Sequence, residues 1–181
     1  LNKHKIIVTG GCGFIGSNFI VKQISETNNS ILNIDKLTYA GNQDNLESIS
    51  SNKRYDFKHL DICDRVKIEK IISKYKPDSI IHFAAESHVD RSIDNPLEFI
   101  NTNILGTVNL LIASKKFYKN NNKFKFLHVS TDEVYGSVDK GLFTENTPYA
   151  PSSPYSASKA SSDHLVRSWG NTYGLPILIT N

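Results

Sequence analysis

The chain has 181 residues, 39% of them hydrophobic and 22% charged, which suits one globular domain with a substantial core. This composition excludes an intrinsically disordered chain, which combines few hydrophobic residues with a high net charge. The net charge is only +3. The densest basic stretch comprises Lys115, Lys116, Lys119, Lys123 and Lys125. We interpret it as a solvated helix end, where the helix dipole favours cations, rather than as a nucleic-acid site.

Two cysteines, Cys12 and Cys63, are too few for a disulfide framework or a four-thiolate zinc site. We therefore predict no metal and favour a reducing compartment. The apolar run Ile6–Val8 is too short for a signal-peptide core, and no later run is long enough to span a membrane. We expect a cytoplasmic protein with no membrane or nucleic-acid partner.

Short apolar runs rich in Ile, Val and Phe alternate with longer amphipathic runs along the chain. The short runs predict strands at 5–9, 31–35, 55–59, 79–83, 124–130 and 175–180, and the longer runs predict helices at 14–25, 66–75, 96–118 and 154–173. This alternation predicts parallel βαβ units. The expected fold class is α/β, a Rossmann-type doubly wound parallel sheet with helices on both faces. The long loop 132–153 is expected to be functional.

A glycine-rich turn joins the first predicted strand to the first helix, with Gly10, Gly13 and Gly16 in the spacing G-x-x-G-x-x-G. A tight turn and a close approach of the backbone to a pyrophosphate both need residues without a Cβ. Because the helix that follows directs free N–H groups at its own N-terminus, this turn predicts a dinucleotide site.

Asp35 ends the second predicted strand, 19 residues after Gly16. Its carboxylate is placed to accept hydrogen bonds from an adenosine ribose, and its charge favours NAD over NADP. Lys36 follows directly and weakens that preference. The alternative is that Asp35 caps a turn, a common role for Asp.

Two further pairs follow predicted strands at the sheet edge where ligands bind. Asp61 and Ile62 come after the third strand, and Ala84 and Ala85 come after the fourth. The small side chains at 84 and 85 would let a cofactor lie close to the backbone. Tight packing explains them equally well, and the spacing does not separate the two interpretations.

Tyr155 and Lys159 are four residues apart, after Ser153 as a predicted N-cap and Pro154 as the first helical residue. The spacing places both side chains on one helix face. A neighbouring ammonium and a nicotinamide cation would stabilise the phenolate, which then accepts the proton of an alcohol. The alternative is an exposed Lys beside a half-buried Tyr.

Thr131, Asp132 and Glu133 follow the fifth predicted strand. Thr131 is a candidate for binding a substrate hydroxyl. Two carboxyl groups with different pKa values would provide a general acid and a general base. Both reach one substrate only if the chain has already left strand geometry, because neighbouring strand residues face opposite ways. The alternative is a solvated or capping acidic pair.

Three strings, residues 35–42, 84–92 and 130–136, together with the glycine turn and Y-x-x-x-K, make the chain resemble the extended short-chain dehydrogenase/reductase superfamily. Within it, the chain is similar to the dTDP-glucose 4,6-dehydratase family from Lys5 to Asn181. The resemblance implies Phe14 and Ile15 at the pyrophosphate of NAD. It also implies the adenosine ribose at Asp35, Lys36, Leu37 and Thr38; the adenine at Asp61 and Ile62; the nicotinamide end at Phe83, Ala84, Ala85, Glu86, Ser87, Thr102, Tyr155 and Lys159; and the sugar at Ser87 and Thr131.

The resemblance further implies an NAD-dependent lyase that acts on dTDP-glucose, with Asp132 as general acid and Glu133 as general base. The expected reaction oxidises C4, eliminates water across C5–C6 and returns the hydride to C6. The family also implies a homodimer paired through long helices. Competing hypotheses are a nucleotide-sugar 4-epimerase, which needs no acid–base pair, a dehydratase of another nucleotide sugar, and a non-catalytic NAD-binding module.

The end of the chain departs from the family pattern. Family members carry a second, smaller substrate-binding domain after this point, and the sequence stops at Asn181. We expect residues 1–181 to form one NAD-binding domain that carries the catalytic residues. We interpret the chain as a fragment or truncated product without the C-terminal substrate-binding domain.

Overall fold

The computed structural model describes residues 3–118, 123–138 and 140–181. Within these residues a six-stranded parallel sheet has the order β3-β2-β1-β4-β5-β6. Its strands are β1 Lys5–Thr9, β2 Ser30–Asp35, β3 Tyr55–His59, β4 Ser79–His82, β5 Lys125–Val129 and β6 Ile177–Thr180. From β1 the sheet extends through β2 to β3 on one side. On the other side it extends through β4 and β5 to β6, so the strand order reverses between β1 and β4. The predicted Rossmann-type doubly wound sheet is confirmed.

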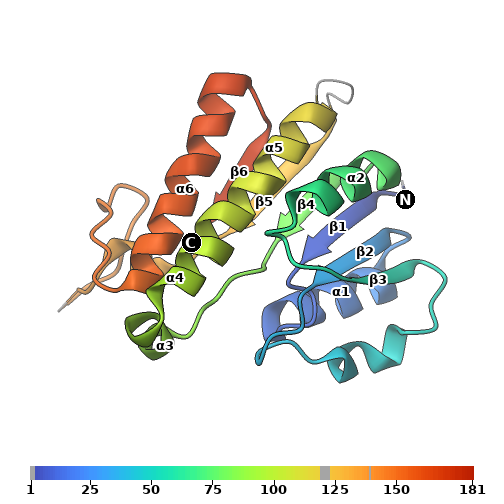
Figure 1. Ribbon diagram of the computed structural model, residues 1–181, viewed down its shortest axis with the longest axis horizontal. Coiled ribbons are helices and arrows are strands. Elements are labelled where there is room, and N and C mark those ends of the chain that lie inside the picture. The colour runs from blue at the N-terminus through green and yellow to red at the C-terminus, as the bar shows by residue number, and fades with distance from the viewer. Residues whose placement is uncertain (1–2, 119–122, 139) are drawn as a thin grey trace.

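Helices cover both faces of this sheet (Figure 1). On one face lie α1 Phe14–Glu26 and the short 3-10 helix η1 Gln43–Ile49; on the other, α2 Arg65–Tyr75, α5 Thr107–Tyr118 and α6 Pro154–Tyr173 lie side by side. Alternate strand residues point to opposite faces, so β1 contributes Ile7 to one core and Val8 to the other. In register, Ile7 lies between Leu32 of β2 and Ile80 of β4, all three buried.

The predicted helix 96–118 is three helical segments in sequence. A short α4 Pro96–Phe99 leads into a π-helical stretch, η2 Ile100–Gly106, and then into α5. At its centre the Asn103 carbonyl accepts hydrogen bonds from the hydroxyls of Thr107 and Ser162, each at 2.6 Å. Side-chain hydroxyls that compete for a helix carbonyl disturb the regular backbone pattern, and Ser162 comes from a separate helix. One of the two contacts at the π-helical stretch is therefore tertiary, and no local sequence pattern predicts it.

Other differences from the predicted elements are local. Strand and helix ends differ by one or two residues, as helix and strand limits commonly do. The structure adds α3 Val89–Asp94 and η1, and it adds a 3-10 turn, η3 Asp132–Tyr135, inside the predicted loop 132–153. That turn carries both candidate acid–base residues.

Two lysines of the basic stretch contact other side chains of the chain, although Lys116 stays largely exposed. Lys116 Nζ lies 2.7 Å from Glu69 Oε2, and Lys115 Nζ lies 3.4 Å from the ring centre of Tyr173. Phe124, one of the aromatic residues between these lysines, is fully buried. Lys119 lies outside the described residues. No helix in the described parts of the chain is both long and apolar enough to cross a membrane.

Candidate functional site

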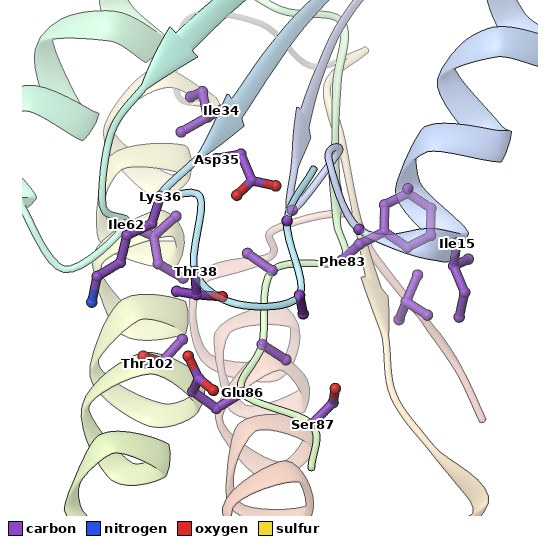
Figure 2. A pocket seen from close by; sticks show the side chains of 18 of the residues that line it. Ile15, Ile34, Asp35, Lys36, Thr38, Ile62, Phe83, Glu86, Ser87 and Thr102 are labelled. Carbon is purple, nitrogen blue, oxygen red and sulfur yellow. The ribbon is translucent and has the colours of Figure 1, made fainter. Parts of the chain in front are cut away.

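A cleft of about 360 Å³ lies at the carboxyl ends of the strands, around the point where the strand order reverses. Figure 2 shows Asp35, Lys36 and Ile62 at one end of it, and Glu86 and Ser87 at the other. It brings together nearly all the predicted cofactor residues: Gly10, Gly13, Phe14, Ile15, Gly16, Asp35, Lys36, Thr38, Asp61, Ile62, Phe83, Ala84, Ala85, Ser87, Thr102, Tyr155 and Lys159. Ligands of doubly wound sheets bind at this position.

Leu37 is the predicted cofactor residue that does not line the cleft. Its φ is +55°, and its backbone N–H donates to Asp35 Oδ1 at 2.8 Å. Several lining residues were not predicted: Ile34, Ala40, Gly41, Leu60, Val129 and Ser130. Ala40, Gly41 and Ser130 belong to the strings that carried the family resemblance, so that signal contained them.

The three glycines of the first turn differ in what a Cβ atom would contact at each position. Gly10 has a φ of +72°, and a Cβ there would lie 2.5 Å from the Ala84 backbone nitrogen. A Cβ on Gly16 would lie 2.4 Å from the Gly10 carbonyl oxygen. A Cβ on Gly13 would meet only that same oxygen, at 3.4 Å, which is ordinary contact. Packing within the chain therefore requires Gly10 and Gly16, whereas at Gly13 it leaves space on the cleft side.

The N-terminus of α1 faces this cleft without a side-chain cap. Gly13 is the N-cap residue and makes no side-chain hydrogen bond, and Phe14 and Ile15 of the first turn line the cleft. The first N–H groups of a helix have no partner within the helix, and they lie at the positive end of its dipole. This end of α1 is therefore suited to an anionic group.

Asp35 is 8% exposed and ties two segments together. Its Oδ2 accepts the Cys12 N–H of the glycine turn, and its Oδ1 accepts the Leu37 N–H, both at 2.8 Å. Asp35 therefore does cap turns through these two hydrogen bonds. Each carboxylate oxygen has two acceptor positions, so the predicted ribose contact remains compatible with these bonds.

Lys36 is engaged by another residue of the cleft. Its Nζ lies 2.9 Å from Asp61 Oδ2. Burial alone would raise the pKa of Asp61, but hydrogen bonds from the Cys63 N–H and the Lys36 ammonium lower it. The lysine charge beside Asp35 is therefore largely balanced by Asp61, which weakens the objection that Lys36 raises against NAD.

Tyr155 and Lys159 project from the first turns of α6, where Ser153 caps the helix and Pro154 follows, as predicted. Burial raises the pKa of Tyr155, and a hydrogen bond with the Thr131 hydroxyl offsets part of the rise. Burial also lowers the pKa of Lys159 to about 8, against the attraction of Asp163. Desolvation therefore has the largest effect on the pKa of the Tyr155 phenol, and it favours the protonated form.

The acidic pair stands where the chain has left strand geometry, the condition that the sequence required. Thr131 Oγ1 accepts the Glu133 N–H and donates to Asp132 Oδ1, both at 3.3 Å. Burial and the neighbouring Asp132 charge raise the pKa of Glu133. These three residues do not line the cleft itself; they adjoin it through Ser130 and through the bond between Thr131 and Tyr155.

The site therefore groups a phenol, an ammonium and two carboxylates next to a cleft with an uncapped helix N-terminus. Such groups serve proton transfer at a bound organic substrate. Among the described residues, no group of three or more His, Cys, Asp or Glu side chains is arranged to hold a metal ion.

Comparison with known proteins shows the family of the chain. A family model described as GDP-mannose 4,6 dehydratase matches residues 7–181, and the chain therefore belongs to that family. Curated relatives include the dTDP-glucose 4,6-dehydratases of Salmonella typhimurium, 55% identical over 98% of this chain and 53% of the relative, and of Neisseria meningitidis serogroup B, 54% identical over 98% and 52%. The chain spans about half the length of the curated relatives it matches.

Solved structures extend the likeness. The NAD-bound dTDP-glucose 4,6-dehydratase DesIV from Streptomyces venezuelae is 43% identical, with a TM-score of 0.90 over 97% of this chain and 54% of that chain. UDP-glucose 4-epimerase from Thermotoga maritima, determined with UDP-glucose, is 32% identical, with a TM-score of 0.85 over 97% and 54%. The backbone arrangement is thus shared by dehydratases and epimerases of nucleotide sugars.

The buried ammonium of Lys159 predicts a pH dependence of stability. Between its pKa of about 8 and the reference value of 10.5, the unfolded chain binds a proton that the folded chain does not. Stability contributed by this group therefore rises with pH in that window, by up to about 1.4 kcal/mol per pH unit. We expect urea denaturation to show wild type gaining stability over Lys159→Met as the pH rises through the window. The exposed Lys70→Met variant is the control, and a parallel pH dependence of wild type and Lys159→Met would contradict the expectation.

Proposed function

We propose that the protein binds NAD in this cleft and dehydrates a nucleotide-activated glucose, dTDP-glucose, to its 4-keto-6-deoxy form. The observation that carries the proposal is the turn η3, which holds Asp132 and Glu133 beside the Tyr155–Lys159 face of α6. The identities with dTDP-glucose 4,6-dehydratases support the choice of reaction and nucleotide. The NAD named in the description of DesIV supports the choice of cofactor.

The residues of the cleft fit a dinucleotide. The uncapped N-terminus of α1 would hold the pyrophosphate, with Gly13 leaving room for close approach. Asp35 retains acceptor positions for the ribose hydroxyls, and Asp61 and Ile62 would flank the adenine. Bound here, NAD would supply the acceptor for the C4 hydride and the donor for its return to C6.

Tyr155 would accept the proton of the C4 hydroxyl. Burial raises the pKa of this phenol, so the step depends on the Lys159 ammonium and the positive charge of the nicotinamide to stabilise the phenolate. Lys159 Nζ donates to the Val129 carbonyl at 2.8 Å, which fixes the ammonium at the end of β5. Ser87 and Thr131 would orient the sugar.

The acidic pair would carry out the elimination. Once C4 is a ketone, the C5 proton is acidic; Glu133 removes it, and Asp132 protonates the departing C6 hydroxyl, which leaves as water. A carboxylate whose pKa is raised is the stronger base, which suits Glu133 to proton abstraction. Hydride return to C6 and protonation of C5 complete the product. One water is lost, and there is no net oxidation.

The base assignment predicts a selective loss. For the protein expressed from its complete reading frame, Glu133→Gln should reduce water loss from dTDP-glucose at least about a hundredfold, because the amide cannot accept the C5 proton. Mass spectrometry of the sugar nucleotide measures the loss, and bound NAD shows that the cleft is intact. An unchanged substrate mass with wild type would refute the proposal; if chromatography then resolved a 4-epimer, which has the same mass as the substrate, the result would point to an epimerase.

Because a Cβ would clash at Gly10 but not at Gly13, substitutions at these two positions should have different effects. Gly13→Ala should leave thermal stability near that of wild type but weaken NAD binding about tenfold or more, because the new methyl group occupies space only on the cleft side. Gly10→Ala should lose stability outright. Calorimetric titration measures the affinity for NAD, and thermal denaturation measures stability. An unchanged NAD affinity in Gly13→Ala would contradict binding of the pyrophosphate at this turn.

We also infer that the protein forms a homodimer and works in the cytoplasm. Leu97, Ile100 and Leu105 are 68%, 43% and 52% exposed on the helical run α4–η2, an unusual display of apolar side chains on one element. The long helices α5 and α6 adjoin it. Cys12 and Cys63 are both free thiols, which supports a reducing compartment.

For a homodimer, we expect light scattering of the protein expressed from its complete reading frame to give the mass of two chains. Leu97→Lys should shift the mass towards one chain, because a buried ammonium opposes the contact. The exposed Leu142→Lys variant in the loop before α6 is the control. A single-chain mass for wild type would contradict the inference.

A further inference from the structure

Asp163 is a buried carboxylate one turn beyond Lys159 on α6, and its residue is 0% exposed. Its Oδ2 accepts hydrogen bonds from Ser130 Oγ at 2.7 Å and Tyr149 Oη at 2.9 Å, with Asn181 Nδ2 at 3.4 Å. Burying a charge is costly unless hydrogen bonds compensate it. Asp163 does not line the cleft, so it has no direct route to a ligand there.

The donors come from the segments that surround the acidic turn. Ser130 joins the end of β5 to Thr131, the residue that caps η3. Asn181, which follows β6, also donates to the Thr131 carbonyl at 3.3 Å. Asp163 therefore fixes the entrance of the turn from two sides.

Tyr149 fixes the far end of the same turn. Its ring packs edge-on against Tyr135, the last residue of η3, with ring centres 5.2 Å apart. The next residue, Ala150, donates its N–H to the Val134 carbonyl at 3.0 Å. Arg167 Nη2 donates to the Tyr149 hydroxyl at 2.7 Å. Because this hydroxyl in turn donates to Asp163, one carboxylate anchors both ends of η3 to α6.

We propose that Asp163 is a positioning residue that holds the Asp132–Glu133 turn against the Tyr155–Lys159 face of α6. This inference rests on the proposed function. In the proposed reaction the two groups of residues serve different steps. Tyr155 and Lys159 of α6 act in the oxidation at C4, and Asp132 and Glu133 of η3 act in the elimination of water. Release of the anchor should therefore slow elimination more than oxidation.

A second effect of Asp163 must be separated from positioning. His128 Nε2 lies 3.2 Å from Asp163 Oδ1, but burial lowers the pKa of His128 to about 4, so the ring is neutral at neutral pH. Lys159 is then the buried cation that the Asp163 charge stabilises. Asp163→Asn removes the charge but keeps an oxygen that accepts from Ser130 and Tyr149. Asp163→Ala removes both.

The experiment compares these variants in the protein expressed from its complete reading frame. Under single turnover with dTDP-glucose and NAD, absorbance of reduced nicotinamide reports oxidation, and mass spectrometry reports water loss. Both variants lose the charge that stabilises the Lys159 ammonium, so we expect any slowing of oxidation to be the same in Asp163→Ala and Asp163→Asn. In Asp163→Ala, water loss should be slowed about a hundredfold relative to oxidation, with transient build-up of reduced nicotinamide, since a misplacement near 1 Å has this effect. Asp163→Asn should restore water loss, relative to oxidation, to within about tenfold of wild type.

Tyr149→Phe keeps the ring contact and loses only the hydroxyl, so it decides the matter if Asp163→Ala does not fold. Tyr149→Phe should slow water loss relative to oxidation by about tenfold. Ser161→Ala, on the exposed side of α6, is the matched control. Equal slowing of both steps in the anchor variants would overturn the proposal, as would an Asp163→Asn variant as impaired as Asp163→Ala.

Hydrogen exchange tests the anchor without any substrate. We expect the amides of residues 130–136 to exchange faster in Tyr149→Phe and Asp163→Ala, while those in the middle of α6 stay as in wild type. Unchanged exchange in the turn would overturn the proposal even if dehydration is observed. If wild type loses no water, the proposed function fails, and exchange of the turn still decides whether the anchor exists.

Discussion

The close approach of two backbones at the centre of the sheet is the constraint on which the site depends. Where β1 ends, Gly10 passes so near Ala84 that a Cβ would lie 2.5 Å from its nitrogen. This contact lets the turns after β1 and β4 diverge around one cleft at the point where the strand order reverses. It also sets the N-terminus of α1 at the cleft wall. A side chain at Gly10 would force apart the two segments that frame the site.

The second theme is the amount of charge buried behind the cleft. Lys159 and Asp163 are both nearly inaccessible on successive turns of α6, and burial holds the pKa of Lys159 near 8. Desolvation of this kind opposes folding, so these residues are poor choices for stability alone. Functional sites commonly carry such groups, and here the anchor at Asp163 links the buried charge to the geometry of the acidic turn.

Much of the site follows from local sequence, and the rest does not. Strand positions, the glycine turn, the Ser153 cap and the Tyr155–Lys159 spacing depend on neighbouring residues, so periodicity and residue type reveal them. Leu37 shows the limit: the resemblance predicts it at the ribose, but no local pattern indicates its positive φ or the bond from its N–H to Asp35. The roles of these residues towards NAD and the sugar stay predictions until they are measured.

The sequence by itself determined the doubly wound sheet, the position of its ligand-binding edge and the residue types gathered there, because these depend on patterns within a few residues. Only the tertiary structure decided the π-helical stretch at 100–106, the raised pKa of Tyr155 and the fixing of the acidic turn. Each of these depends on contacts across the chain, such as Ser162 with Asn103 and Ser130 with Asp163. Burial and long-range hydrogen bonds arise when separate elements pack together, and no local pattern encodes which groups they will join.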